Sequence, residues 1–314
     1  MGARNALLAL ARNGSDVSAR DHFETERENP ASAALDTLSV GAAFDVLNAE
    51  DARVAAAVAR AKGEIVKTIE LVADRLSRGG RLIYVGAGTS GRLAVLDATE
   101  CPPTFQSDPT LVQGVIAGGD KALTTAVEGA EDSSEAGAEA VRARKVKDLD
   151  VVLGIAAGGT TPFVHGALAQ AQERGAATVF FACVPRDQAP DGADISIRVI
   201  TGPEVVAGST RMKAGTATKL VLNAISTLVM VRLGKVHGNL MVDVNTRGNA
   251  KLWQRGIGLV ARIAQVDRAE AEALLEAAGG AVKVAVVMRL KSLSRLEAEE
   301  NLRRAGGVLR RALA

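Results

Sequence analysis

Three stretches rich in glycine, serine and threonine could hold a small anion in this 314-residue chain. They cover residues 86–91, 156–162 and 202–219. Glycine lets the backbone approach a ligand closely, and the first N–H groups of a helix have no partner within that helix. Hydroxyl groups in the same loops can donate to phosphate oxygens. The candidate binding residues are Gly88, Thr89, Ser90, Gly159, Thr160, Thr161, Ser209, Thr210 and Lys213.

The third stretch also carries positive charge. Ser209 and Thr210 stand where an N-cap belongs, before a long apolar helix expected over 220–233, and capping alone would account for both hydroxyls. Arg211 and Lys213 lie at the same expected helix start. Cationic side chains beside two hydroxyls suit an anionic substrate.

The first two loops each follow an apolar run typical of a buried strand and precede a helical pattern. Predicted strands cover 81–85, 150–155, 177–183 and 195–200, with 112–116 as a further candidate, and the helices after the two loops cover 92–98 and 163–174. Strands that alternate with helices predict an α/β fold with a doubly wound parallel sheet. Ligands bind beyond the carboxyl ends of the strands in such sheets.

Helical patterns flank this sheet region. One covers residues 45–76, and helices dominate from about residue 250. Asp267, with Glu270 three positions later, predicts a capped helix start, and the pairs Gly279-Gly280 and Gly306-Gly307 predict helix ends. The expected organisation is a loosely ordered lead-in over 1–21, a sugar-phosphate domain over 22–250 and a small all-helical lobe over 251–314.

Composition argues against several classes of partner. Lys and Arg number 38 against 36 Asp and Glu, so the chain lacks the strong basic excess of a nucleic-acid groove, and 3% aromatic residues offer few platforms for stacking bases. No apolar run approaches the roughly 20 residues that span a bilayer. The two cysteines suit a reducing compartment. We therefore expect a cytoplasmic protein that binds neither nucleic acid nor membrane.

A dinucleotide site is one alternative for the first loop, because Gly86, Gly88 and Gly91 approximate a GxGxxG motif. That site expects an acidic residue at the end of the next strand, about 20 residues on. Glu100 lies near, but the following Cys101-Pro102-Pro103 fits no strand interior. An ordinary turn without a ligand also remains possible for any single loop.

Several motifs together carry a family resemblance that runs from about Phe23 to the carboxyl terminus. They are Thr25-Glu26 with Asn29-Pro30, and the segments 79–93, 100–104, 116–119, 128–133, 202–217 and 238–243. With them the chain resembles the N-acetylmuramic acid 6-phosphate etherases. That family belongs to the sugar isomerase (SIS) superfamily and is related to the glucokinase regulatory protein. The resemblance implies a SIS-type, flavodoxin-like sheet.

The resemblance also implies an activity. The family cleaves the D-lactyl ether of N-acetylmuramic acid 6-phosphate, giving N-acetylglucosamine 6-phosphate and D-lactate. This lyase reaction belongs to amino sugar catabolism and peptidoglycan recycling. It implies a cytoplasmic homodimer that needs no cofactor and no metal.

The chemistry of such an ether requires two carboxyl groups. Once the sugar ring opens, the C2 proton becomes acidic; a base removes it, lactate leaves from C3 and water adds back. By resemblance, Glu100 is the proton donor to lactate, Glu131 abstracts the C2 proton and Glu128 contacts the sugar. Without the resemblance, each would be interpreted as a solvated surface carboxylate.

The chain departs from the family at two places. Gly158 stands where relatives often have Ser, so Thr160 and Thr161 could take over contact with the phosphate. Glu28 stands where relatives often have Arg. Two other functions remain possible: a non-catalytic phosphosugar-binding regulator, which could dispense with both carboxyls, and a SIS-type sugar-phosphate isomerase, which shares the C2 proton abstraction.

Overall fold

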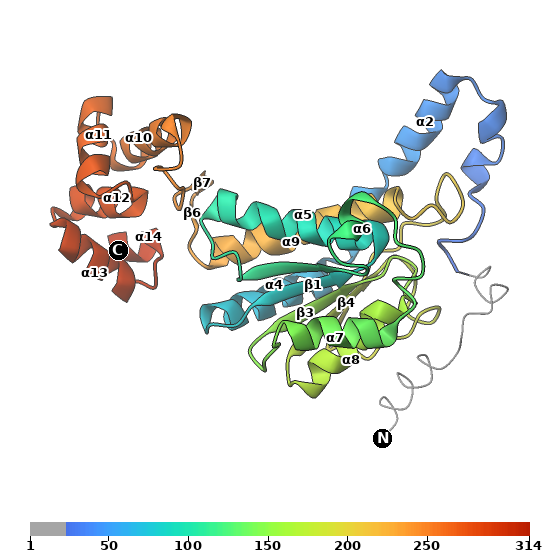
Figure 1. Cartoon of the computed structure of the whole chain (residues 1–314). Helices are drawn as coiled ribbons and strands as arrows, with labels where there is room; N and C mark the ends of the chain where they lie inside the picture. The colour runs from blue at the N-terminus through green and yellow to red at the C-terminus, as the bar shows by residue number, and fades with distance from the viewer. Residues whose placement is uncertain (1–22) are drawn as a thin grey trace. The chain divides into compact units, whose positions relative to one another are not determined.

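The computed structural model describes residues 23–314 (Figure 1). The lead-in expected over 1–21 lies outside the described residues. The chain divides into two compact units. One runs up to Thr99 and continues over Thr110–Ser226, and the other comprises Glu100–Pro109 with Thr227–Ala314.

The first unit contains a five-stranded sheet in which every strand pair is parallel. The strand order is β2-β1-β3-β4-β5, so the chain winds outward from β1 in both directions. The three central strands β1, β3 and β4 are buried throughout, as a sheet covered on both faces requires, whereas the edge strands β2 and β5 are partly buried. The prediction of a doubly wound parallel α/β sheet is confirmed. The strands are β1 (Leu82–Gly86), β2 (Val112–Ile116), β3 (Val151–Ile155), β4 (Ala177–Ala182) and β5 (Ile195–Arg198).

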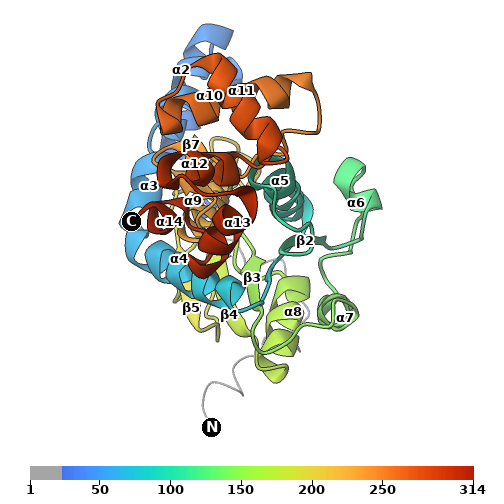
Figure 2. The ribbon, with the colours of Figure 1, turned by 90° about the vertical axis from the view of Figure 1, so that its left-hand side faces the viewer.

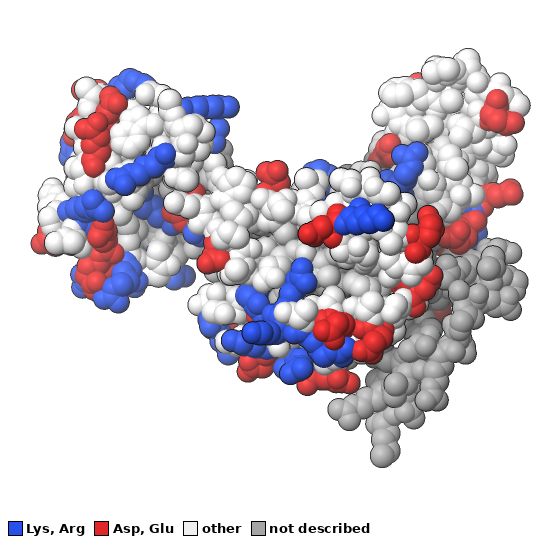
Figure 3. All heavy atoms as spheres, in the orientation of Figure 1, with Lys and Arg blue, Asp and Glu red and all other residues white. Residues whose placement is uncertain are grey.

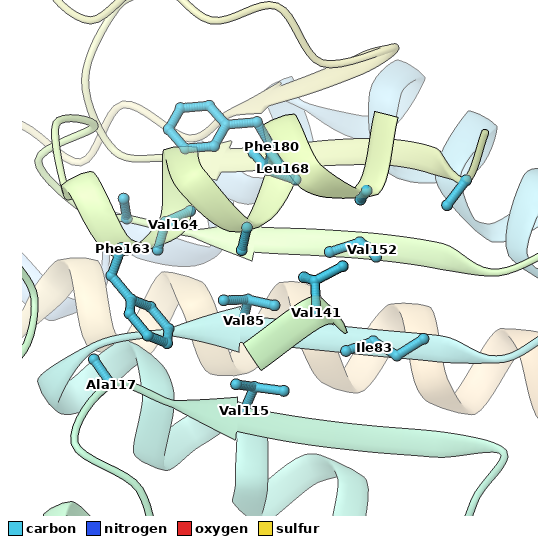
Figure 4. Packing of buried hydrophobic residues seen from close by; sticks show 14 of the residues in the cluster. Ile83, Val85, Val115, Ala117, Val141, Val152, Phe163, Val164, Leu168 and Phe180 are labelled. Atoms are coloured by element: carbon cyan, nitrogen blue, oxygen red, sulfur yellow. The ribbon is translucent and has the colours of Figure 1, made fainter. Parts of the chain in front are cut away.

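One face of the sheet is covered by α7 (Ser134–Ala143) and α8 (Pro162–Glu173), as Figures 1 and 4 show. Phe163 and Leu168 of α8 belong to one buried cluster with strand residues such as Val85 and Val152. Gly154 in β3 lets α8 approach, because a Cβ there would lie 2.6 Å from Val164 Cγ1. This packing fixes the start of α8 at the carboxyl edge of the sheet.

Helices α4 (Lys62–Ser77) and α5 (Gly88–Phe105) also flank the sheet. α5 runs past the end predicted for it at residue 98 and includes Pro102 and Pro103. The helical stretch predicted over 45–76 is three helices in the structure. They are α2 (Val40–Asp51), α3 (Val54–Arg60) and α4, preceded by short 3-10 turns η2 (Pro30–Ser32) and η3 (Leu35–Thr37).

The second unit is mostly helical (Figure 2). The Asp267 side chain accepts from the Glu270 N–H and caps α11, which confirms that prediction. Both predicted glycine pairs end helices with positive φ. The elements are the strand pair β6 (Val236–His237) and β7 (Leu240–Met241), followed by α10 (Ala250–Ala264), α11 (Arg268–Ala277), α12 (Val282–Lys291), α13 (Arg295–Arg304) and α14 (Leu309–Leu313).

Helix α9 (Lys213–Arg232) is the one helix among residues 23–314 that is long and apolar enough to cross a membrane. More than half of its most apolar window is buried within the protein, so its composition is also that of a core helix.

On the face drawn in Figure 3, basic and acidic side chains are interspersed. Arg142 on α7 pairs with both Glu135 and Glu139, which illustrates how the near-equal charges are distributed.

Candidate functional site

A cavity of about 230 Å³ lies where β1 and β3 end, the edge at which α/β sheets bind ligands. Its wall is largely polar because the loops after both strands contribute hydroxyl groups. Of the predicted binding residues, the structure brings Gly88, Thr89, Ser90, Thr160, Thr161 and Thr210 to this cavity.

The first loop turns directly into α5. Gly86 permits the tight turn, since a Cβ there would lie 2.8 Å from the Gly91 nitrogen. Gly88 has φ +52° and begins the helix. The N–H groups of Gly88, Thr89 and Ser90 are therefore in the first turn of an 18-residue helix, where they lack helical partners and the helix dipole favours an anion.

The second loop places its two threonines in the cavity wall and turns Gly159 away from it. Gly159 has φ +83°, and a Cβ there would lie only 2.4 Å from Ala189 Cβ. The Gly159 carbonyl accepts a hydrogen bond from Nε2 of His165 at 2.8 Å. Gly159 thus shapes the loop from behind, while its neighbour Gly158 lines the cavity together with Thr160 and Thr161.

The third stretch differs from the sequence prediction. Thr210 lines the cavity, but Ser209 does not, and neither hydroxyl caps α9. The buried Glu204 carboxylate caps that helix instead, accepting from the backbone N–H groups of Lys213 and Ala214 at 2.9 Å each. A carboxylate in that place complements the positive end of the helix.

Lys213 also lies elsewhere than expected. Its side chain is buried, and its Nζ is 2.5 Å from Oε2 of Glu50, so the ammonium forms an internal ion pair and does not line the cavity. Burial by itself raises the pKa of Glu50. Hydrogen bonds from Lys213 and Asn29 outweigh this effect, so the pKa of Glu50 lies below its ordinary value. The predicted role of Lys213 in contacting an anion therefore has no support in the geometry.

An amino-terminal strap, Phe23–Ser32, completes the cavity wall through Phe23 and Glu26. The Thr25 carbonyl accepts from the Gly208 N–H at 3.1 Å, and Ser32 Oγ donates to the Val205 carbonyl at 2.8 Å. Asn29 Nδ2 donates to the Pro203 carbonyl at 3.1 Å. These bonds fasten the strap to the segment that leads into α9.

The predicted carboxylates are placed differently from one another. Glu131 lines the cavity, held there because its own carbonyl accepts from the Phe163 N–H at the start of α8. Glu131 and Glu128 both line a neighbouring hollow of about 180 Å³. Glu100 is exposed on α5, twelve residues after Gly88, which is about 18 Å along a helix axis. Glu131 is thus among the residues that line the cavity, and Glu100 is not.

Charge at the site comes mainly from carboxylates and the backbone. The described residues that line the cavity include Glu26 and Glu131 and no Lys, Arg or His. Positive potential there is supplied by the start of α5. Across residues 23–314, no group of three or more His, Cys, Asp and Glu side chains could hold a metal ion.

Comparison with known proteins places this geometry in a family. The N-terminal SIS domain of the glucokinase regulatory protein matches residues 64–172. An N-acetylmuramic acid 6-phosphate etherase of Crocosphaera subtropica is 53% identical over 272 residues, which are 87% of this chain and 89% of the relative. An etherase of the same name from Gloeobacter violaceus is 56% identical over 85% of this chain and 87% of its own.

This chain belongs to the N-acetylmuramic acid 6-phosphate etherase family.

A solved phosphoheptose isomerase from Francisella tularensis is similar at a TM-score of 0.47 and 20% identity, covering 63% of this chain and 99% of that one.

Three parts of this etherase-family site have no local signal in the sequence. Nothing local marks Glu204 as a helix cap or Glu50 as the partner of Lys213. The third is the strap: nothing in the Thr25-Glu26 and Asn29-Pro30 motif indicates its neighbour Gly208, which is about 180 residues away along the chain.

Proposed function

We propose that this chain cleaves the D-lactyl ether of N-acetylmuramic acid 6-phosphate, releasing N-acetylglucosamine 6-phosphate and D-lactate. The observation that carries the proposal is the position of Glu131. Its carboxylate lies in the wall of a cavity whose other walls hold loop hydroxyls and a helix start. A base and an anion site in one cavity are what deprotonation of a sugar phosphate requires.

The phosphate binds at the first turn of α5 in this proposal. Backbone N–H groups of Gly88, Thr89 and Ser90 lie there, with the hydroxyls of Thr89 and Ser90 beside them. Thr160, Thr161 and Thr210 add hydroxyls from the other walls. This arrangement binds a dianion with neutral donors, so it does not depend on Lys213.

Glu131 acts as the base at C2. In the open-chain aldehyde, the C2–H bond breaks and its proton passes to Glu131. The electron pair forms the C2–C3 double bond as the C3–O bond breaks, and the departing lactate oxygen takes a proton from Glu100. Water then adds to C3, giving a proton back to Glu100, while Glu131 returns its proton to C2. All protons and electrons balance, and no cofactor enters.

Glu100 reaches the reaction from a second copy of the chain. Within its own helix it stands about 18 Å from the phosphate-binding turn. A homodimer that inserts the exposed end of α5 into the partner's site would bring the acid to the base. The same exposed position is what a residue donated to another subunit needs.

The substrate and product suggest where the protein acts. We place it in the cytoplasm, as an enzyme of amino sugar catabolism in peptidoglycan recycling, because its substrate is a phosphorylated cell-wall sugar.

The direct test is release of D-lactate from N-acetylmuramic acid 6-phosphate, with Glu131→Gln as the test variant. Glu70→Gln, on an exposed position of α4, is the matched control. We expect lactate from the wild type and the control, and a loss of at least about 10²-fold in Glu131→Gln. Reaction in heavy-oxygen water should label C3 of the product. Absence of lactate from the wild type would refute the proposal.

Mixing two inactive variants tests the shared site. In a hybrid dimer of Glu100→Ala and Glu131→Ala subunits, one of the two sites combines an intact Glu131 with an intact Glu100. Random exchange makes half of the dimers hybrids, so about a quarter of wild-type activity should return. If both carboxylates act within one subunit, every site carries a lesion and no activity returns.

A further inference from the structure

The second hollow adjoins the cavity and shares part of its wall. Ala87, Gly88 and Glu131 line both spaces. Its volume is about 180 Å³, and it is formed by the start of α5 with the segment from Ala117 to Glu131. A ligand that occupies both spaces therefore passes directly beside the Glu131 carboxylate.

The lining of this hollow combines small apolar residues with one cation and two carboxylates, Glu128 and Glu131. The apolar side chains are Ala87, Ala117, Ala122, Ala126, Val127 and Ala130. The cation is Arg92, which α5 places one turn beyond the phosphate-binding residues. Such a surface suits a group that carries both a methyl and a negative charge.

Arg92 is held in place with its outer nitrogens available. Its Nε donates to the Leu123 carbonyl in α6 (Lys121–Thr124) at 3.2 Å, which fixes the guanidinium plane. Among residues 23–314, no side chain or carbonyl pairs with the two terminal nitrogens. Guanidinium presents paired N–H donors in a rigid fork that matches a carboxylate.

We propose that this hollow is the lactyl subsite and that Arg92 binds the lactyl carboxylate, which makes Arg92 a specificity-determining residue. The inference rests on the proposed function. The lactyl group consists of a methyl and a carboxylate on one carbon, so the alanine and valine side chains contact the methyl while Arg92 pairs with the carboxylate.

The shared wall gives the substrate its direction. With the phosphate at the first turn of α5 and the lactyl group in the hollow, the carbons between them lie at the junction. Glu131 is the acidic side chain that lines both spaces, so it faces C2, next to the carbon that carries the ether. The subsite thus explains why the base is found where the two spaces meet.

Glu128 is the opposing charge in this hollow. It is exposed at the lining and has the same sign as the lactyl carboxylate. Its negative charge disfavours the proposed ligand, so the attraction for the lactyl carboxylate has to come from Arg92.

The test compares two substrates that differ only in charge: N-acetylmuramic acid 6-phosphate and its analogue in which the lactyl carboxylate is an amide. We expect the wild type to prefer the carboxylate in kcat/KM by about 10- to 100-fold, the range of a charge-assisted hydrogen-bonded pair. Arg92→Gln should reduce that preference to near one, and Arg92→Lys should give an intermediate value. Lys121→Gln removes an exposed cation from α6 and should retain the full preference.

The outcomes separate the two proposals. If the wild type releases no lactate from the natural substrate, the proposed function fails and the subsite fails with it. If lactate is released but the wild type shows no preference for the carboxylate, or Arg92→Gln keeps that preference, the etherase proposal survives and the subsite is overturned. Should Arg92→Gln fold poorly, the ratio measured for Arg92→Lys decides, since an unchanged ratio rejects a forked contact.

Discussion

Lys213 and Glu50 form a buried ion pair, with 2.5 Å between Nζ and Oε2. They lie 163 residues apart and connect the first turn of α9 to the end of α2. The two ends of the pair are supported unequally. Glu50 also accepts from Asn29 at 2.8 Å and pairs with Arg53 at 2.8 Å. The Lys213 side chain, by contrast, has Glu50 as its one partner among the described residues.

That inequality predicts an asymmetric pair of variants. Glu50→Met leaves a buried ammonium without a partner and should cost about 3–5 kcal/mol in the free energy of unfolding. Lys213→Met leaves Glu50 with its other two partners and should cost less. Urea denaturation of both proteins measures the difference. The double variant should recover much of the loss, and equal costs for the two single variants would contradict the unequal support.

The pair also predicts acid sensitivity. The folded-state pKa of Glu50 lies below its ordinary value of about 4.5, because hydrogen bonds to the charged form outweigh burial. This carboxylate therefore contributes stability above that ordinary value, and the contribution is lost as the pH falls through the lowered pKa. Glu50→Gln should flatten that part of the curve of unfolding free energy against pH.

The Glu204 carboxylate should be essential to the start of α9. It is buried and satisfies two backbone N–H groups. Glu204→Gln replaces one acceptor oxygen with an amide donor, which leaves a buried N–H group unsatisfied and should cost about 1–3 kcal/mol. Urea denaturation beside Glu70→Gln, an exposed control, measures it. A stability equal to that of the control would show that the cap contributes nothing.

Substitution by alanine should reduce stability at Gly159 and have little effect at the adjacent Gly158. At Gly159 a Cβ would lie 2.4 Å from Ala189 Cβ and φ is +83°, so Gly159→Ala should displace the loop and cost about 1–3 kcal/mol. At Gly158 the nearest atom to a Cβ is Thr25 Oγ1 at 3.7 Å, so Gly158→Ala should fold normally. Thermal unfolding in parallel compares them; similar losses would mean that the loop geometry is wrong.

His165 should make stability depend on pH below neutrality. Burial lowers its pKa and outweighs the hydrogen bond to the Gly159 carbonyl, which raises it. The unfolded chain takes up a proton near pH 6.5 that the folded chain excludes. The contribution is therefore complete above that pH and is lost as the pH falls below it.

His165→Asn should remove this part of the pH dependence, measured as unfolding free energy between about pH 5 and 8. His237 is the matched comparison, because burial lowers its pKa too and it lies in the other unit. Each single variant should remove only its own share. An unchanged curve for His165→Asn would show that the pKa of His165 is the same in the folded and the unfolded chain.

The sheet was predictable because its signals are local. Apolar runs such as 150–155 are followed by loops rich in glycine and threonine, and β3 begins within one residue of the predicted strand. The end of α5 was not, because Pro102 and Pro103 are strong local breakers and yet lie inside its last turns. Tertiary packing of Ala94, Ala98 and Cys101, all buried, holds that stretch helical.

In the site, too, the features with a local sequence signal were predictable and those set by tertiary contacts were not. Loop hydroxyls at Thr89, Ser90 and Thr160 were predictable, since each loop directly follows its own strand. The environment of Lys213 was not, because a cation beside serine and threonine has the same local sequence whether it meets a ligand or a buried carboxylate. The partner that decides is Glu50, and only the folded chain brings it near.

The strap Phe23–Ser32 has a consequence for folding. Its bonds to Pro203 and Val205 close loops of more than 170 residues, the slowest kind of contact to form in a chain of this size. The cavity wall is thus completed only after the sheet and its helices have assembled. A bound sugar phosphate then stabilises the chain whose strap has docked in preference to every earlier species. The apparent affinity for the ligand therefore depends on the fraction of chains whose strap has docked.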